Sequence, residues 1–538
     1  MLIHMKSCRL LLLAIVGATV VACGGPDDDD GARVATLHRG LSSDPESLDP
    51  HKARSVQAGD VLRDIGEGLT SYSTSGELVP GAAQEWTISA DGLVYTFTLR
   101  ADARWSNGDA LTAQHFTFSL RRLVDPATAA FYAQALADIV NAEAITAGSL
   151  PPAELGVAAV DDRTLVITLA RPTPYLLGLL THPSTFPVHP VSIAQSGDAF
   201  TRPGTLLSNG AYKLEAWEPG SVIRLRRNEQ YWNNQATAID AVHHHVLTQE
   251  VTELNRYRAG ELHITASVPP DSFERVRDEH RDELHIAPYL GVYYYGFNLT
   301  KPPFKDAPEL RQALSMAIDR AVLVEKVTGR GEAPAYSWVP AGVNNYEPRR
   351  FAYAELSQDE RNAAAKRLYR DAGYSDTNPA EIELRYNTSD TQQRIALAIQ
   401  SMWQEVLGVK TTLVNEEFQV LLANMRAAEI TQVFRSSWIG DYNDAHTFLS
   451  ILQAGNPSNM PRYVSDEFDS LMQRAAVQID PHRRRLFLEE AERVLLADHP
   501  VIPLYFYVSK HLVSPDVTGW GDNVLDYHYS QHLSLRTD

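Results

Sequence analysis

Three consecutive histidines, His243, His244 and His245, are the group in this sequence whose residue types best suit a metal ion. Imidazole nitrogens bind Zn²⁺ and other transition metals. The three lie in a segment of alternating apolar residues, however, and neighbouring side chains of a strand point to opposite faces of a sheet. They cannot all converge on one ion, so the pattern favours a sheet surface over a metal site.

Motifs that mark catalytic sites are missing from the sequence. It has no G-x-S-x-G, no H-E-x-x-H and no G-x-x-x-x-G-K-[ST], which are typical of serine hydrolases, zinc proteases and phosphate-binding loops. Its only cysteines, Cys8 and Cys23, lie near the N-terminus. We therefore expect a protein that is not an enzyme and holds no metal or cofactor. An exported peptide hydrolase is kept as an alternative, which a nucleophile–base pair would support.

The N-terminal segment has the residue order of a secretory signal. Lys6 and Arg9 precede an apolar run that ends in Val20-Val21-Ala22-Cys23, and basic, apolar and small residues in this order are typical of exported proteins. The last four of these residues resemble a bacterial lipobox. We expect a signal peptide over residues 1–22, a lipid anchor on Cys23 and an acidic tether over residues 23–35.

Length and charge limit what the rest of the chain can be. The chain has 538 residues, more than a single core normally supports, so two or three domains are expected. Its formal net charge is −19, and no run of lysines and arginines stands out. Nucleic acid is therefore not an expected partner, because binding to phosphates requires clustered positive charge.

Strand and helix patterns alternate along the chain, which indicates a mixed α/β fold. Apolar residues at every second position predict strands at residues 93–99, 165–169 and 222–225. Helical spacing from Leu310 to Ala321 predicts a helix with Gly329 as its stop. Ser357 with Glu360 forms a capping box that predicts a helix ending near Gly373. Residues 381–414 have the pattern strand, helix, strand, which predicts a βαβ unit.

Short motifs distributed over the chain resemble those of bacterial extracellular solute-binding protein family 5, which serves peptide ABC importers. These motifs are Ala83-Gln84-Glu85-Trp86, Asp91-Gly92-Leu93-Val94-Tyr95-Thr96-Phe97, Trp105-Ser106-Asn107-Gly108, Asn209-Gly210-Ala211-Tyr212, Tyr231-Trp232-Asn233-Asn234 and Asp441-Tyr442-Asn443. The resemblance extends in collinear order over essentially the whole chain after the N-terminal segment. It implies a periplasmic-binding-protein-like clamp with two lobes and three domains, which closes around its ligand by a hinge motion.

The resemblance also implies how the chain is divided among the three domains. Domain I would be assembled from residues 36–66, 191–290 and 508–538. Domain II, residues 67–190, and domain III, residues 291–507, would be inserted between these pieces. The chain would cross between the lobes twice, close to the two ends of domain III.

A peptide site is implied residue by residue. Asp441 matches the aspartate that pairs with the α-ammonium group of a bound peptide, a strong contact once water is excluded. Two segments match stretches that pair as added strands with the peptide main chain, and these are Arg54-Ser55-Val56 and Ser437-Trp438-Ile439. Because main-chain pairing is the same for every peptide, broad specificity is expected.

Aromatic, basic and amide side chains complete the implied site. Four positions match aromatic residues that line the family's pockets, with core packing as the alternative, and these are Tyr132, Phe418, Tyr289 and Tyr294. Arg426 and Arg435 match basic positions near the carboxylate end of the peptide, with structural ion pairing as the alternative. Asn209, from one of the matching motifs, belongs to the same predicted set.

Several positions depart from the family pattern. Gln392 replaces a histidine that can meet the peptide carboxylate, and Arg54 replaces an acidic pocket residue, so we expect Arg54 to favour acidic or neutral ligand side chains over basic ones. Gly291 and Ile439 stand where a disulfide-bonded cysteine pair occurs in the family.

The function that the resemblance implies is that of a substrate-binding lipoprotein of an oligopeptide importer. It would be a monomer in the periplasm or on the exterior of the cell envelope. Its partners would be short peptides and a membrane permease with separate ATPase subunits. A receptor for murein peptides is the main alternative, because those peptides also carry a free α-amino group. A peptide-sensing or chaperone-like lipoprotein without a permease is another.

Overall fold

The computed structural model describes residues 34–428 and 431–536. The predicted signal peptide, Cys23 and most of the predicted tether lie outside these residues. The described chain belongs almost entirely to one compact unit, Ala35–Asp538. Within the described ranges, no helix is both long enough and apolar enough to cross a membrane.

A four-stranded sheet is assembled from distant parts of the sequence. Its strands, in spatial order, are β1 (Thr36–Leu41), β10 (Ala241–Val246), β9 (Val222–Arg227) and β8 (Tyr212–Glu218). β1 is parallel to β10, and the other neighbours are antiparallel. Helix α1 (Val56–Ile65) contributes Val61 and Leu62 to the core of this sheet, and Val513 and Leu533 join the same core from the C-terminal end of the chain.

A second, antiparallel sheet has a separate hydrophobic core. Its strands, in spatial order, are β4 (Ala83–Ile88), β5 (Val94–Leu99), β7 (Thr164–Thr168) and β6 (Val157–Ala159). Helix α2 (Ala113–Val124) adds Phe116 and Leu120 to this core, whose buried residues all lie between Leu69 and Leu180. The strands predicted from alternation are confirmed as β5, β7 and β9, because in each strand the apolar residues on one face are buried.

The third sheet has six strands and the largest core. Its strands, in spatial order, are β12 (Ala333–Pro334), β16 (Val501–Leu512), β11 (Leu284–Phe297), β15 (Val433–Ile439), β13 (Glu381–Asn387) and β14 (Lys410–Glu416). The predicted βαβ unit is confirmed: β13 and β14 are parallel and are joined by α11 (Asp390–Leu407). The capping box of Ser357 and Glu360 is also confirmed, at the start of α10 (Gln358–Asp371).

The helix predicted from Leu310 is interrupted near Asp319, whereas its predicted stop is confirmed, because Gly329 (φ 64°) follows the last helical residue, Thr328. Helix α8 (Pro308–Met316) ends before Asp319, whose carboxylate accepts a hydrogen bond from the N–H of Val322 at 3.1 Å. This contact caps a new short helix, α9 (Arg320–Val322). A capping aspartate therefore interrupts a helix that apolar spacing alone would continue.

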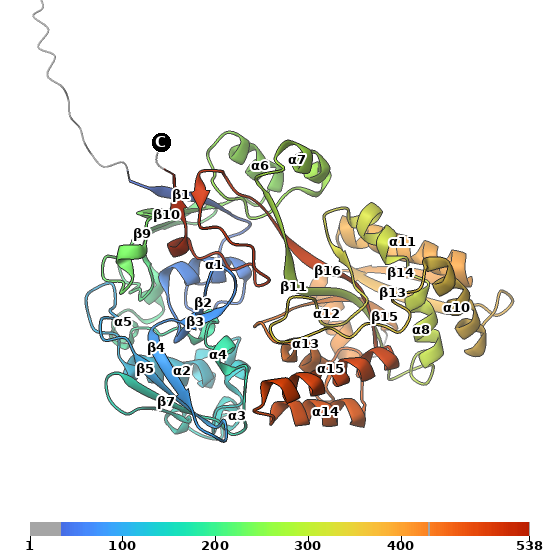
Figure 1. The fold of residues 1–538 in the computed structure, drawn as a ribbon, viewed down its shortest axis with the longest axis horizontal. Helices are drawn as coiled ribbons and strands as arrows, with labels where there is room; N and C mark the ends of the chain where they lie inside the picture. The colour runs from blue at the N-terminus through green and yellow to red at the C-terminus, as the bar shows by residue number, and fades with distance from the viewer. Residues whose placement is uncertain (1–33, 429–430, 537–538) are drawn as a thin grey trace, which may run out of the picture. The chain divides into compact units, whose positions relative to one another are not determined.

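Two long strands connect the regions of the first and third sheets. β11 and β16 are antiparallel and run side by side between these regions (Figure 1). At one end, Leu284 and Leu512 pack in a small core with α6 (Glu250–Arg258) and α7 (Phe273–Glu279). Their register shifts between Pro288 and Val292, so the pairing is interrupted where the chain passes between the two regions.

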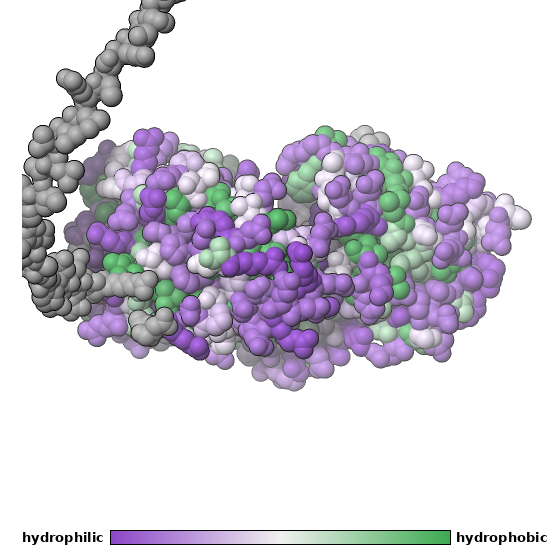
Figure 2. Space-filling view, turned by 90° about the horizontal axis from the view of Figure 1, so that it is seen from above, coloured by the Kyte–Doolittle hydropathy of each residue, from purple (hydrophilic) through white to green (hydrophobic). Residues whose placement is uncertain are grey.

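The surface agrees with the acidic composition. The face drawn in Figure 2 is mostly hydrophilic, with hydrophobic side chains in scattered positions. Single exposed apolar residues such as Val160 and Val464 are ordinary on folded proteins.

Candidate functional site

Asp441 lies just beyond the end of β15. Its main-chain N–H donates to Thr447 Oγ1 at 3.3 Å. Its carboxylate makes no hydrogen bond or ion pair with any residue that the structure describes. Burial raises the pKa of this carboxyl to about 6. A carboxylate removed from water without a cation is costly, so the site is suited to a positively charged ligand group.

Tyr132 approaches Asp441 from the region of the second sheet. Burial, followed by the negative charge of Asp441, raises the pKa of Tyr132 to about 12. The ring of Tyr132 also lies 4.5 Å from that of His182 between centroids. The structure therefore brings together two residues that were predicted for the site and that lie more than three hundred positions apart in the sequence.

The strand before Asp441 has an edge that another strand could use. On one side, β15 pairs along its whole length with residues Gly291 to Phe297 of β11. On the other side β13 reaches only Val433 and Phe434. From Arg435 to Ile439, no strand in the described part of the chain pairs with this edge. The predicted segment Ser437-Trp438-Ile439 lies here, where an extended peptide could add a strand.

The other predicted pairing segment has a different local structure. Ser55 has an extended backbone (φ −85°, ψ 153°) and caps α1, accepting from the N–H of Ala58 at 3.1 Å. The N–H groups of Arg54 and Ser55 both donate to Glu46 Oε1. Val56 is the first residue of α1, and its pairing with a peptide stays a prediction. A peptide strand would have to displace the Glu46 carboxylate to use these amides.

Arg54 faces solvent beside an aromatic ring. The guanidinium carbon lies 6.0 Å from the ring centroid of Phe131, which is itself 52% exposed. An arginine on an aromatic face in water contributes modestly to stability but stays free to meet a ligand. Its predicted effect on side-chain preference stays a prediction.

Arg435 and Gln392 meet at Tyr293. The guanidinium carbon of Arg435 lies 5.0 Å from the centroid of the Tyr293 ring, whose hydroxyl donates to Gln392 Oε1. Tyr505 stacks on the same ring at 4.6 Å. The buried Nε of Arg435 has no hydrogen-bond partner among the described residues. A guanidinium held against tyrosines without a carboxylate is suited to an acidic ligand group.

Two predicted site residues have structural roles instead. Tyr294 is 2% exposed and packs edge-on against Trp338 in the core of the third sheet, because alternation along β11 turns it away from Tyr293. Asn209 is buried, and its amide pairs with the main chain of Glu67: Nδ2 donates to the carbonyl at 2.8 Å and Oδ1 accepts from the N–H at 3.2 Å. Both polar atoms of Asn209 are therefore already used.

The remaining predicted residues lie at the surface or near the crossing strands. Phe418 and Arg426 are exposed at the two ends of α12 (Phe418–Ala427). Tyr289 is partly buried on β11, and burial and then the charge of Asp526 raise its pKa. No hydrogen bond, ion pair or ring contact joins these three residues to Asp441 or to Arg435 within the described ranges.

Sequence reasoning missed an aromatic contact beside the candidate site. Tyr175, from the region of the second sheet, stacks on Tyr442 at 5.0 Å and on His446 at 4.4 Å. Arg484 pairs with Asp444 at 2.7 Å behind these rings. Tyr442 belongs to the motif that contains Asp441, so its position was available, but its partner Tyr175 lies in a loop without a periodic pattern.

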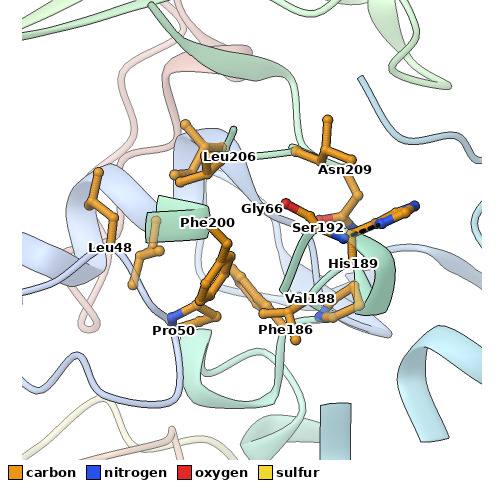
Figure 3. Close-up of a pocket in the computed structure, with 14 residues that line it drawn as sticks. Leu48, Pro50, Gly66, Phe186, Val188, His189, Ser192, Phe200, Leu206 and Asn209 are labelled. Carbon is orange, nitrogen blue, oxygen red and sulfur yellow. Dashed lines mark hydrogen bonds between the residues drawn. The ribbon is translucent and has the colours of Figure 1, made fainter. Parts of the chain in front are cut away.

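Two cavities lie in the described part of the chain. Figure 3 shows a small apolar cavity of about 30 Å³, whose lining includes Phe186, Phe200, Leu206 and Asn209. That volume holds a water molecule but no peptide. A larger cavity, of about 310 Å³, lies beside Asp444 and Arg484 and includes Pro174. Neither cavity is lined by Asp441 or Arg435.

The histidine triplet behaves partly as expected. His244 is buried, and its Nε2 lies 3.1 Å from Asp64 Oδ2. His243 and His245 point to the opposite face, as strand alternation requires. The expectation of a plain sheet surface needs a correction, however, because these two rings converge with His38 of the neighbouring strand β1.

Comparisons with known proteins agree with the geometry. Residues 77–460 match the family described as bacterial extracellular solute-binding proteins, family 5. The chain is 39% identical to the periplasmic oligopeptide-binding protein OppA of Escherichia coli strain K12 over 533 residues, covering 98% of this chain and 97% of that protein.

Solved structures give the same result. The structure of the Escherichia coli murein tripeptide binding protein MppA has a TM-score of 0.80 and 37% identity, covering 94% of this chain and 99% of the other. Haemophilus influenzae OppA, in complex with RPPGFSPFR, has a TM-score of 0.78 and 35% identity, again covering 94% and 99%. These neighbours have the two-lobed fold of periplasmic peptide-binding proteins. The chain belongs to the bacterial extracellular solute-binding proteins, family 5.

Proposed function

We propose that this protein is the peptide receptor of an ABC importer, which captures short peptides and delivers them to a membrane permease. The observation that carries the proposal is the partly buried carboxylate of Asp441, which has no partner among the described residues and lies at the end of the free edge of β15. Relatives named as oligopeptide-binding proteins cover nearly the whole chain, which supports the same function.

The contacts suggest how a peptide would be held. The α-ammonium group pairs with Asp441 and restores the charge balance that burial disturbs. The extended main chain of the peptide pairs with β15 between Arg435 and Ile439. This pairing does not depend on the side chains of the peptide. The carboxylate end binds near Arg435, whose guanidinium has no acidic partner in the described chain. Tyr132, whose pKa the charge of Asp441 raises, would face the ligand from the other lobe.

The domain boundaries and the hinge are part of this proposal. Domain I would comprise residues 36–66, 191–290 and 508–538, domain II residues 67–190, and domain III residues 291–507. The separate hydrophobic cores support this division. The register shift between β11 and β16, near Pro288, supports closure by bending at the crossing strands.

The cellular setting is inferred from the family and the N-terminal sequence. Relatives are periplasmic binding proteins, which supports a periplasmic location and a receptor rather than an enzyme. We propose that a lipid on Cys23 attaches a monomeric receptor to a membrane, and that separate ATPase subunits drive the permease. No motif for ATP binding occurs in the sequence.

A second candidate ligand is a murein peptide. Of the two solved structures described above, the murein tripeptide binding protein is slightly more similar to this chain than the oligopeptide-binding protein is, with 37% against 35% identity. Asp441 fits both ligands, because both carry a free α-amino group. The two ligand classes differ in the rest of the molecule, so they require a direct binding comparison.

The test is calorimetric titration of the ligand-free protein with a mixed-length peptide library and with an N-acetylated copy of the same library. Binding that acetylation abolishes, and that the substitution Asp441→Asn weakens, is the expected result. Equal binding of both libraries would contradict the ammonium contact. No binding of either library, with binding of a murein tripeptide, would favour the second candidate.

A further inference from the structure

We propose that His38, His243 and His245 form a binding site for a divalent transition metal, with Zn²⁺ as the reference ion. Parallel pairing of β1 with β10 places His38 opposite His243, and His245 follows two residues later on the same face. One ring nitrogen from each histidine lies within 4.8 Å of those of the other two. The site is separate from Asp441 and does not rest on the proposed function.

The distances are close to those of a metal centre. His38 Nδ1 and His245 Nε2 are 2.9 Å apart. Nitrogens at 2.0–2.1 Å from a tetrahedral ion are separated by roughly 3.3 Å, so small ring rotations suffice. The ring centroids of His38 and His243 are 5.1 Å apart. Three imidazoles favour Zn²⁺, Co²⁺, Ni²⁺ or Cu²⁺ over Mg²⁺ and Ca²⁺, which prefer oxygen ligands.

A fourth histidine, His263, contacts the first of these histidines. The N–H of His38 donates to His263 Nδ1 at 2.9 Å, and the two rings lie 5.5 Å apart between centroids. His38, His243 and His245 are all partly exposed, so an ion can reach them from solvent. His244, by contrast, is turned to the other face and is buried against Asp64.

The charged neighbours of the site decide how strongly it binds. Arg256, on α6, donates from Nη2 to His245 Nδ1 at 3.5 Å and from Nε to Glu261 at 2.8 Å. Arg224 of β9 lies opposite His243, and Glu215 of β8 is close enough to act on His243. The two arginines oppose a cation, and the two glutamates partly offset them.

Arg256 also competes through the tautomer of His245. A neutral imidazole that binds metal through Nε2 carries its proton on Nδ1. Nδ1 can then no longer accept from Arg256, so metal binding must release that contact. Substitution of Arg256 by glutamine therefore removes both a competing donor and a repelling charge, and should tighten metal binding.

A second histidine group serves as a comparison. His511 Nε2 and His528 Nε2 lie 2.9 and 3.0 Å from the same oxygen of Asp526. These groups already satisfy one another by hydrogen bonding, so the proposal is confined to the group on β1 and β10. Metal binding that depended on His528 would place the ion at Asp526 and overturn the proposal.

The experiment uses the exported chain purified without a histidine tag and treated with a chelator. Zn²⁺ is titrated by calorimetry, and Co²⁺ by the visible absorption of a tetrahedral ion. We expect one ion per chain, at least about tenfold weaker binding for His243→Gln and His245→Gln, and tighter binding for Arg256→Gln. His482→Gln, at an exposed histidine of α15 (Pro481–Asp498), is the matched control and should bind as the unaltered protein.

Other outcomes would contradict the proposal. The absence of stoichiometric binding would overturn it, as would equal affinity in the unaltered protein and in both His243→Gln and His245→Gln. The Co²⁺ spectrum of the unaltered protein tests nitrogen ligation even where a variant folds poorly. Peptide affinity measured on His243→Gln should be unchanged, so failure here is distinguishable from failure of the proposed receptor function.

Discussion

Asp441 and Asp526 are both carboxylates in buried surroundings, but only one of them has partners. Burial alone would raise the pKa of Asp526, yet the positive charge of His511 and its hydrogen bond hold this pKa far below the usual range. Burial raises the pKa of Asp441 to about 6, and no described residue compensates its charge. The comparison suggests that Asp526 stabilises the fold, whereas Asp441 is reserved for a ligand.

Removing the charge of Asp526 should have the largest effect. Asp526→Asn leaves His511 buried with an uncompensated charge, and breaking a buried pair costs about 3–5 kcal/mol of unfolding free energy. Urea unfolding of the ligand-free protein measures this loss. Asp198→Asn is the control, because Asp198 pairs with Lys52 on the surface, where a pair contributes about 0–1 kcal/mol. A similar loss in both variants would break the comparison.

Removing the charge of Asp441 should act on binding and not on folding. Asp441→Asn should weaken the binding of tripeptides with neutral side chains about a hundredfold, or about 3 kcal/mol, since the ammonium loses its counter-charge. Calorimetry of each tripeptide beside its N-acetylated form measures the effect. The acetylated form should bind both proteins alike.

The same substitution should stabilise the ligand-free protein. The folded-state pKa of Asp441, about 6, exceeds its usual value of 3.8. The ionised carboxylate therefore destabilises the folded protein increasingly as the pH rises above about 4. Asp441→Asn should therefore raise the unfolding free energy by about 1–3 kcal/mol at pH 7 and leave it unchanged below pH ~4. Destabilisation at pH 7 would assign Asp441 a structural role like that of Asp526.

The pH dependence of stability should identify the partner of Asp526. Burial lowers the pKa of His511, but the charge of Asp526 outweighs it and raises this pKa to about 9. The charged pair of His511 and Asp526 stabilises the fold fully at pH values below about 6.5, the pKa of histidine in the unfolded chain. This stabilisation, up to about 3 kcal/mol, is lost as the pH rises through 9. The difference in unfolding free energy between the unaltered protein and His511→Gln should shrink over that window. A constant difference would exclude the charged pair.

Local features of the fold were predictable from sequence because neighbouring residues determine them. Alternation predicted β5 and β7, and the capping box at Ser357 predicted the start of α10. The βαβ unit followed from a change of periodicity within forty residues. The two-lobed architecture came from motif resemblance, since no local pattern indicates that distant segments share the first sheet.

Contacts between distant segments were not predictable. His38 meets His245 only because β1 pairs with β10, more than two hundred residues away. The amides of Arg54 and Ser55 are occupied by Glu46, which no motif indicated. Tyr293 rather than Tyr294 contacts Arg435. Which of these two side chains points to that face of the sheet depends on how β11 pairs with its neighbouring strands.

The smallest expected effect is the pH dependence of peptide affinity, and it tests the ligand side of the comparison. With a pKa of about 6 for Asp441, roughly one-tenth of the ligand-free protein is ionised at this position at pH 5. The peptide ammonium stays protonated from pH 5 to 7, so only the receptor titrates. Affinity should fall about tenfold, or about 1.4 kcal/mol, as pH is lowered from 7 to 5.

Calorimetry with one tripeptide across this pH range provides the measurement, and Asp441→Asn provides the control. The variant carries no titrating group at this position, so its weaker affinity should stay level over the same range. If the affinity of both proteins changed equally with pH, a residue other than Asp441 would be the titrating group. Asp441 would then have to be paired in solution, and the distinction from Asp526 would disappear.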